Sequence, residues 1–305
     1  MNQLQGIAAT AALAIDSRCQ LGEGIVWDGR TQRLYWTDIL SSRLWMHAPD
    51  SGRTHDWALP EPLGCLALCE DGRLLLALAK SLRLADAPEP GVPLALRTLC
   101  ALEPWHGAAT RSNDGRCDRH GNFVFGTKDE TGAEPPLGRF YQFSIAHGLR
   151  PLPLPPVAIP NSICFSPDGG TLYFCDSAQP RILRCDYDPE AASVSAPVVF
   201  AQVEGGGAAD GSTVDADGYL WNAQWGAGRV VRYAPDGRID RVLAIPAGMP
   251  SCCAIGGKAL DTLYVTTARE EMDAAALAAA PTAGGVFALV LEGPVGLPEA
   301  RLRSA

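Results

Sequence analysis

A short polar turn between two apolar, β-favouring runs recurs six times along the chain. In the first copy residues 25–27 and 34–36 flank a connection centred on Asp28-Gly29, which is typical of a β-hairpin. The turn glycines of the six copies lie at intervals of 43, 49, 48, 49 and 39 residues, at positions 29, 72, 121, 169, 218 and 257. A hairpin repeated with a period in the forties predicts a β-propeller.

Each of these hairpins is followed by a second, more variable strand pair, for example at residues 43–46 and 229–233. Two hairpins per repeat give blades of four antiparallel strands, so we expect an all-β, six-bladed propeller in a single domain over residues 1–305. Only residues 270–280 favour a short helix. Residues 11–16 have no hairpin partner of their own, and we expect them to add a strand to the last blade and close the ring.

Composition excludes several classes of partner. The net charge is −9 and no basic cluster stands out, which disfavours nucleic acid. No run of about 18 apolar residues exists, so we expect no membrane span. The ten cysteines form no CxxC framework and several lie within apolar runs, which indicates a reducing compartment, by default the cytoplasm. We expect a monomer or a weak homo-oligomer.

Oxygen-bearing side chains stand just before the inner strand in four of the repeats. They are Glu23, the pair Asn113-Asp114, Asn161 and Asp210. Each one alone is explained by a local turn hydrogen bond. Because a ring brings equivalent positions of distant repeats to one rim, we expect the four to converge there. Carboxylate and amide oxygens together predict a site for a hard divalent cation such as Ca²⁺, Mg²⁺ or Mn²⁺, which Zn²⁺ also tolerates.

Four separated motifs resemble those of the SMP-30/gluconolactonase family, which includes regucalcin and the bacterial sugar lactonases. They are Leu21-Gly22-Glu23-Gly24 followed by Trp27, Arg111-Ser112-Asn113-Asp114-Gly115, Pro160-Asn161-Ser162 followed by Phe165-Ser166, and Ala209-Asp210-Gly211. The resemblance spans all six repeats. It implies a six-bladed propeller with one divalent cation in its channel.

The resemblance also implies roles for individual residues. Glu23, Asn161 and Asp210 would be the metal ligands, and Asp210 would also serve as the general base. Arg111 and Asn113 would hold the substrate. The cation could be Ca²⁺, Zn²⁺, Mg²⁺, Mn²⁺ or Fe²⁺.

The chain departs from the family pattern at a few positions. The family often has proline where this chain has Ile25 and Ala209, and an aromatic residue at Ser112. Lys128 stands where methionine is common, and it could reach a substrate oxygen or an anionic substituent, although a solvated loop lysine is an equal interpretation. Glu130 is a further candidate for the pocket.

Hydrolysis of a lactone fits such a site, because a cation stabilises the oxyanion that forms when water attacks the ester carbonyl. The sequence has no G-x-S-x-G elbow, HExxH motif or Walker loop, so no motif in it indicates a serine hydrolase, a zincin or a nucleoside triphosphatase. We therefore expect a metal-dependent sugar lactonase, a carboxylic ester hydrolase, that opens a pentono- or hexonolactone to the aldonic acid in a bacterial-type sugar oxidation route. The alternatives are a non-catalytic, metal-containing propeller that binds a ligand or partner, and a related metal-dependent esterase or phosphotriesterase.

Overall fold

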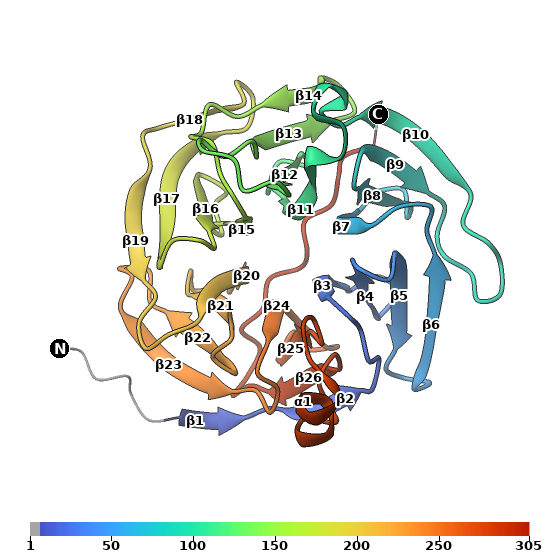
Figure 1. Cartoon of the computed structure of the whole chain (residues 1–305), viewed down its shortest axis with the longest axis vertical. Coiled ribbons are helices and arrows are strands. Elements are labelled where there is room, and N and C mark those ends of the chain that lie inside the picture. Colours follow the sequence, from blue (N-terminus) through green and yellow to red (C-terminus); the bar gives the residue numbers. More distant parts are fainter. Residues whose placement is uncertain (1–6, 305) are drawn as a thin grey trace.

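Six small sheets stand in a ring around a central channel in the computed structural model, which describes residues 7–304 (Figure 1). The expected six-bladed propeller of antiparallel blades is confirmed. From the innermost strand outward, the first three blades contain β3 (Gly22–Asp28), β4 (Arg33–Asp38), β5 (Arg43–Ala48) and β6 (Arg53–Ala58); β7 (Leu63–Leu68), β8 (Leu74–Leu78), β9 (Ser81–Ala85) and β10 (Leu96–Ala101); and β11 (Thr110–Cys117), β12 (Phe123–Asp129), β13 (Phe140–Ser144) and β14 (Gly148–Pro151).

The second half of the ring repeats the same order with small additions. The fourth and fifth blades contain β15 (Pro160–Phe165), β16 (Thr171–Asp176), β17 (Arg181–Asp188), β18 (Ser193–Val194) and β19 (Val198–Gln202); and β20 (Ala208–Val214), β21 (Leu220–Trp225), β22 (Arg229–Tyr233) and β23 (Ile239–Ala244). The sixth contains β24 (Pro250–Gly256), β25 (Thr262–Thr267) and β26 (Val286–Val290). The short helices are η1 (Pro104–Ala109) and α1 (Ala274–Ala279), and no helix in residues 7–304 is long and apolar enough to cross a membrane.

The N-terminal segment closes the ring. The strand β2 (Ala12–Ile15) pairs antiparallel with β26 as the outermost strand of the sixth blade, with Leu13 opposite Phe287, so the expected closing strand is confirmed. The strand β1 (Ile7–Thr10), which was not expected, lies parallel to β23 on the edge of the fifth blade. The strands β1 and β2 therefore become the outer edges of the fifth and sixth blades.

Apolar side chains fill the spaces between blades. The largest buried clusters each combine residues of two neighbouring blades, because alternate side chains of a strand point to opposite faces of its sheet. In the first blade Val26 and Tyr35 pack against the second blade, whereas Ile25 and Trp36 pack against the sixth. No blade has a core of its own, so the blades stabilise one another around the circle.

The innermost strand of every blade carries a break in register against the next strand. These irregularities lie between Glu23 and Val26, Leu63 and Cys65, Ser112 and Gly115, Asn161 and Cys164, Ala209 and Ser212, and Pro250 and Cys253. An inserted residue bends a strand and re-aims its side chains. The breaks stand at the end of the channel where the chain enters each blade, and the expected site residues lie at them or beside them.

The C-terminal segment, residues 291–304, crosses the ring at the opposite end of the channel (Figure 1). It is hydrogen-bonded near the inner hairpin turns of three blades, through Ala216 N to Val295 O, Leu302 N to Leu68 O, and Arg303 N to Gly121 O. Its Glu299 pairs inside the channel with Arg116 of β11, at 3.3 Å. Arg116 and Glu299 therefore occupy the channel from this end, and the candidate residues line a cavity at the rim that carries the register breaks.

Candidate active site

A cavity of about 300 Å³ opens at this rim of the channel. Six of the residues singled out in the sequence line it, contributed by four blades: Glu23, Arg111, Asn113, Lys128, Asn161 and Asp210. Each of the inner-strand candidates lies inside its strand rather than before it, at the start of β3, β11, β15 and β20. Glu130 does not line the cavity, although it contacts residues that do.

Two buried carboxylates lie close together in the channel, Glu23 of β3 and Asp210 of β20. Their exposed fractions are 8% and 5%, and Asp210 Oδ1 is buried with no hydrogen-bond partner among the described residues. Burial, and then the neighbouring Asp114 carboxylate, raise the pKa of Glu23 to about 8. Burial and the carboxylate of Glu23 hold the pKa of Asp210 well above its usual value. The Arg111 guanidinium offsets only part of the rise in the pKa of Glu23, so within residues 7–304 the pair is short of compensating positive charge.

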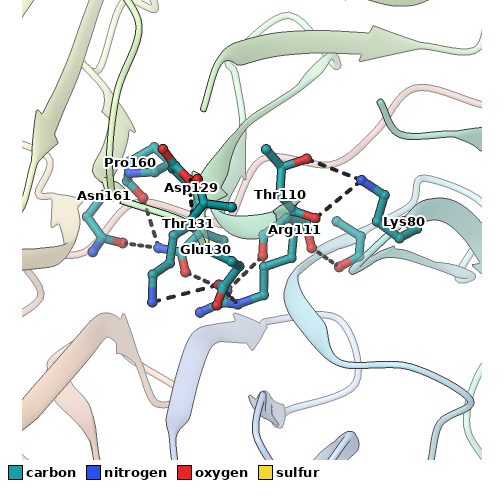
Figure 2. Close-up of polar contacts among 12 residues, drawn as sticks. Lys80, Thr110, Arg111, Asp129, Glu130, Thr131, Pro160 and Asn161 are labelled. Atoms are coloured by element: carbon teal, nitrogen blue, oxygen red, sulfur yellow. Dashed lines mark hydrogen bonds and ion pairs between the residues drawn. The ribbon is translucent and has the colours of Figure 1, made fainter. Parts of the chain in front are cut away.

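Asn161 is held so that its amide oxygen faces the neighbouring site residues. Its Nδ2 donates to Ser177 Oγ at 2.8 Å, and the Ser177 hydroxyl in turn donates to Ala209 O at 2.6 Å. Asn161 Oδ1 accepts from Asn113 Nδ2 at 3.0 Å (Figure 2). Since a carbonyl oxygen has two lone pairs, Asn161 Oδ1 retains one for a further donor or a cation.

Asp114 lies beneath these residues and shapes the strand that carries Asn161. Its Oδ2 accepts from Ile163 N at 2.8 Å and its Oδ1 from Gly115 N at 2.8 Å. The first of these bonds fixes the backbone in the register break that follows Asn161. Ser162, inside that break, has a left-handed φ of 61°. Burial raises the pKa of Asp114 as well.

Arg111 lies at the centre of a polar network on one wall of the cavity (Figure 2). Its Nη1 donates to Asn113 Oδ1 at 2.7 Å, and its Nε is 2.7 Å from Glu130 Oε1. Lys128, its cross-strand neighbour on β12, is 3.8 Å from the same Glu130 oxygen. Glu130 thus orients two cationic side chains from the edge of the cavity, and both still face into it.

The donors present suit a hard divalent cation. Glu23, Asp210 and Asn161 offer only oxygen, and the partnerless Asp210 Oδ1 together with the raised pKa values marks a shortage of positive charge. Within residues 7–304 no three His, Cys, Asp or Glu side chains gather as a possible metal cluster. A cation held here by Glu23 and Asp210 would have the amide oxygen of Asn161 as a third protein donor.

Several cavity residues were missed in the sequence, notably Ser177, Trp225, Met249, Glu270 and Glu271. Ser177, Glu270 and Glu271 follow the second strand of a blade and Trp225 ends one, just as Lys128 lies near the end of β12, whereas Met249 precedes β24. The second strand returns to the same rim at which the first strand begins. Comparing the ends of the second strands across the six repeats would have identified Ser177, Trp225, Glu270 and Glu271.

The sequence of the chain from residue 21 to residue 269 matches the model of the SMP-30/gluconolactonase/LRE-like region. The chain belongs to this family. Among curated members of the SMP-30/gluconolactonase family, it is 47% identical over 284 residues to the L-arabinolactonase of Azospirillum brasilense, covering 92% of this chain and 91% of the relative. It is 35% identical over 273 residues to the 6-deoxy-6-sulfogluconolactonase of Pseudomonas putida, covering 88% and 90%.

A solved structure of the same family has the same architecture. The calcium-binding protein regucalcin of Agrobacterium tumefaciens strain C58 superimposes with a TM-score of 0.88 and is 34% identical to this chain, covering 97% of this chain and 98% of the other. The resemblance stated from the four sequence motifs is therefore confirmed at the level of family and fold.

Proposed function

We propose that this protein hydrolyses a sugar lactone, a pentono- or hexonolactone, to the aldonic acid, with Asp210 as general base and a divalent cation as cofactor. The observation that carries the proposal is the buried pair Glu23 and Asp210, with an unpartnered carboxylate oxygen, in a cavity walled by Arg111. Two relatives named as lactonases, at 47% and 35% identity over most of the chain, support the same class of reaction.

Glu23, Asn161 and Asp210 would hold the cation, which as a Lewis acid supplies stabilisation of the negative charge that develops on the lactone carbonyl oxygen. Arg111 and Lys128 add fixed positive charge at the wall of the same cavity. Because Glu130 holds the Arg111 guanidinium through Nε, the remaining donors of Arg111 are pre-oriented for the ring and hydroxyl oxygens of the substrate.

Asp210 would act on the proton of the attacking water. Its Oδ1 has no other hydrogen-bond partner in the described part of the chain and so is available to accept that proton. The oxygen of the water forms a bond to the carbonyl carbon, the ring C–O bond then breaks, and the proton returns from Asp210 to the departing alkoxide as a hydroxyl. A well-placed general base contributes about 10²–10⁴-fold to the rate.

The test is a kinetic screen of the purified protein against D- and L-pentono- and hexonolactones, with chelator and with each divalent cation restored in turn. We expect hydrolysis that chelator abolishes and a cation restores. Asp210→Asn should lower kcat by about 10²–10⁴-fold. Glu23→Gln should lower both the affinity for the cation and the activity.

Two results would contradict the proposal. Full activity in both variants would remove these carboxylates from the mechanism. Binding of lactones without hydrolysis under every cation would instead favour the non-catalytic binding module, and cleavage of simple esters alone would favour the esterase.

A further inference from the structure

The loop between β25 and β26 presents two glutamates, Glu270 and Glu271, to the cavity. The start of this loop is fixed beside the first blade. Ala268 forms a bridge with Leu21, Arg269 N donates to Gln20 O at 2.9 Å, and Arg269 Nε donates to Ala283 O at 2.7 Å at the far end of the loop. The two glutamates are therefore held on a fastened turn next to the strand that carries Glu23.

Glu271 occupies a backbone position that favours glycine. Met272 N donates to Arg269 O at 3.1 Å and closes a four-residue turn, in which Glu271 is the third residue with a φ of 58°. A positive φ at that position is free of strain for glycine but not for glutamate. The side chain is thus placed at the cavity at a conformational cost, although within residues 7–304 it has no ion-pair or hydrogen-bond partner there.

Carboxylates outnumber cationic groups around the cavity. The wall contains Arg111 and Lys128 as its basic side chains, and Glu130 contacts both of them. The acidic members are Glu23, Asp210, Glu270 and Glu271, and the buried Asp210 keeps its Oδ1 without a hydrogen-bond partner within residues 7–304. Even with one divalent cation added, the local charge including Glu130 stays negative.

We propose that Glu270 and Glu271 determine substrate specificity by charge: they accept hydrogen bonds from the hydroxyls of neutral lactones and exclude lactones that bear a carboxylate, sulfonate or phosphate. The inference rests on the proposed lactonase function and deepens it. Carboxylates at the mouth of the cavity accept strong hydrogen bonds from sugar hydroxyls and repel a second anion. The same repulsion favours release of the anionic product through that mouth.

The test compares an aldonolactone with the aldarolactone of the same ring size, in which a carboxylate replaces the terminal hydroxymethyl group. Wild-type protein should cleave the neutral lactone with the higher kcat/KM at low ionic strength. Glu271→Gln, Glu271→Gly and Glu270→Gln should each shift the ratio toward the anionic lactone by about threefold to tenfold, chiefly through KM. In about 1 M salt the wild-type preference should shrink, because the Debye length falls to roughly 3 Å.

Two controls separate charge selection from a structural effect. Glu89→Gln removes an exposed carboxylate from the loop between β9 and β10, on the opposite face of the ring, and should leave the ratio unchanged. Glu271→Gly removes the strain as well as the charge, so its melting temperature should equal or exceed that of wild type. Loss of selectivity in a variant that is no less stable cannot come from misfolding.

The outcomes distinguish the two proposals. If wild type cleaves the neutral lactone and the variants keep the wild-type ratio within about twofold, the charge selection is wrong while the lactonase function stands. If wild type cleaves no lactone of either kind, the proposed function is wrong and the specificity inference falls with it.

Discussion

Glu23 and Asp210 form an unusual pair, because both carboxylates are withdrawn from water and neither forms an ion pair with a basic side chain in the described part of the chain. Taking a carboxylate out of water is costly unless an opposite charge compensates for it. In the polypeptide alone that cost appears as raised pKa values. A bound cation would remove it, so protonation and cation binding compete for the same oxygens.

The raised pKa of Glu23 makes stability depend on pH when cations are removed by chelator. A carboxyl whose pKa rises from 4.5 to about 8 on folding binds its proton more tightly in the folded state. Its contribution is therefore fully present below the unfolded pKa and is lost as pH rises toward 8. We expect the melting temperature of chelated protein to fall between about pH 5 and pH 8.

Calorimetry across this range checks the prediction. Glu23→Gln should flatten the profile, because the variant side chain does not titrate, and saturating divalent cation should raise the wild-type melting temperature most at the alkaline end. A wild-type profile without slope in chelator, identical to that of the variant, would show that the pair is not strained in the folded state.

At the scale of elements, the innermost hairpins were predictable because each one repeats the same local chemistry. Asp28 Oδ1 accepts from Arg30 N at 2.9 Å, and Asp118 Oδ1 accepts from His120 N at 2.8 Å, so each turn is closed by a hydrogen bond between its own residues. The closing strand β2 followed from an unpaired apolar run. Part of the candidate site could be predicted in the same way, because equivalent positions of the innermost strands meet at one rim of the channel.

Other elements could not be predicted, because they depend on contacts between segments far apart in the sequence. The pairing of β1 with β23 joins residues more than two hundred positions apart and has no local signal. The register break beside Asn161 has no glycine to mark it, because Ser162 adopts the positive φ there, whereas the break beside Glu23 contains Gly24 with a φ of 55°. The C-terminal segment contains only an isolated bridge and no strand, and its position becomes defined only once the ring exists.

The C-terminal segment should stabilise the ring through two largely buried ion pairs, Arg301 with Asp28 and Glu299 with Arg116. Arg116 lies in the channel, where its Nη1 donates to Ser212 O at 2.9 Å and Glu299 lies 3.3 Å from its Nε. The two side chains are 10% and 15% exposed. Glu299→Ala leaves a buried guanidinium without its anion, so we expect the free energy of unfolding to fall by about 3 kcal/mol.

Urea unfolding followed by circular dichroism measures this loss. Glu299→Gln keeps the size and a hydrogen-bond acceptor and should lose less, and the double variant Arg116→Met/Glu299→Leu should recover much of the stability because neither charge remains. A change below about 0.5 kcal/mol in Glu299→Ala would mean that the Arg116–Glu299 ion pair adds little to the stability of the ring.

For the molecule as a whole, stability is shared around a circle of interfaces rather than concentrated in one core. Nine of the ten cysteines are buried and the tenth, Cys100, is half-buried; all are free thiols. Many lie in the apolar clusters between blades, among them Cys65 and Cys164. These thiols therefore report on the integrity of the entire ring.

Thiol labelling of native protein tests this shared stability. Burial raises the pKa of Cys19 and of Cys69 to about 12, so few of their thiols are ionised at neutral pH and a disulfide reagent should react slowly with them. We expect at most the half-buried Cys100 to react quickly, and the remaining thiols to react together on unfolding. Fast labelling of several thiols in native protein would instead show that blades open independently.

The strand-free C-terminal segment spans one end of the channel, so the site at the other end is a blind pocket. A molecule that reaches the carboxylates must leave through the opening by which it entered. A new substrate can then bind only after the previous product has left, and the residues that line the opening influence both steps.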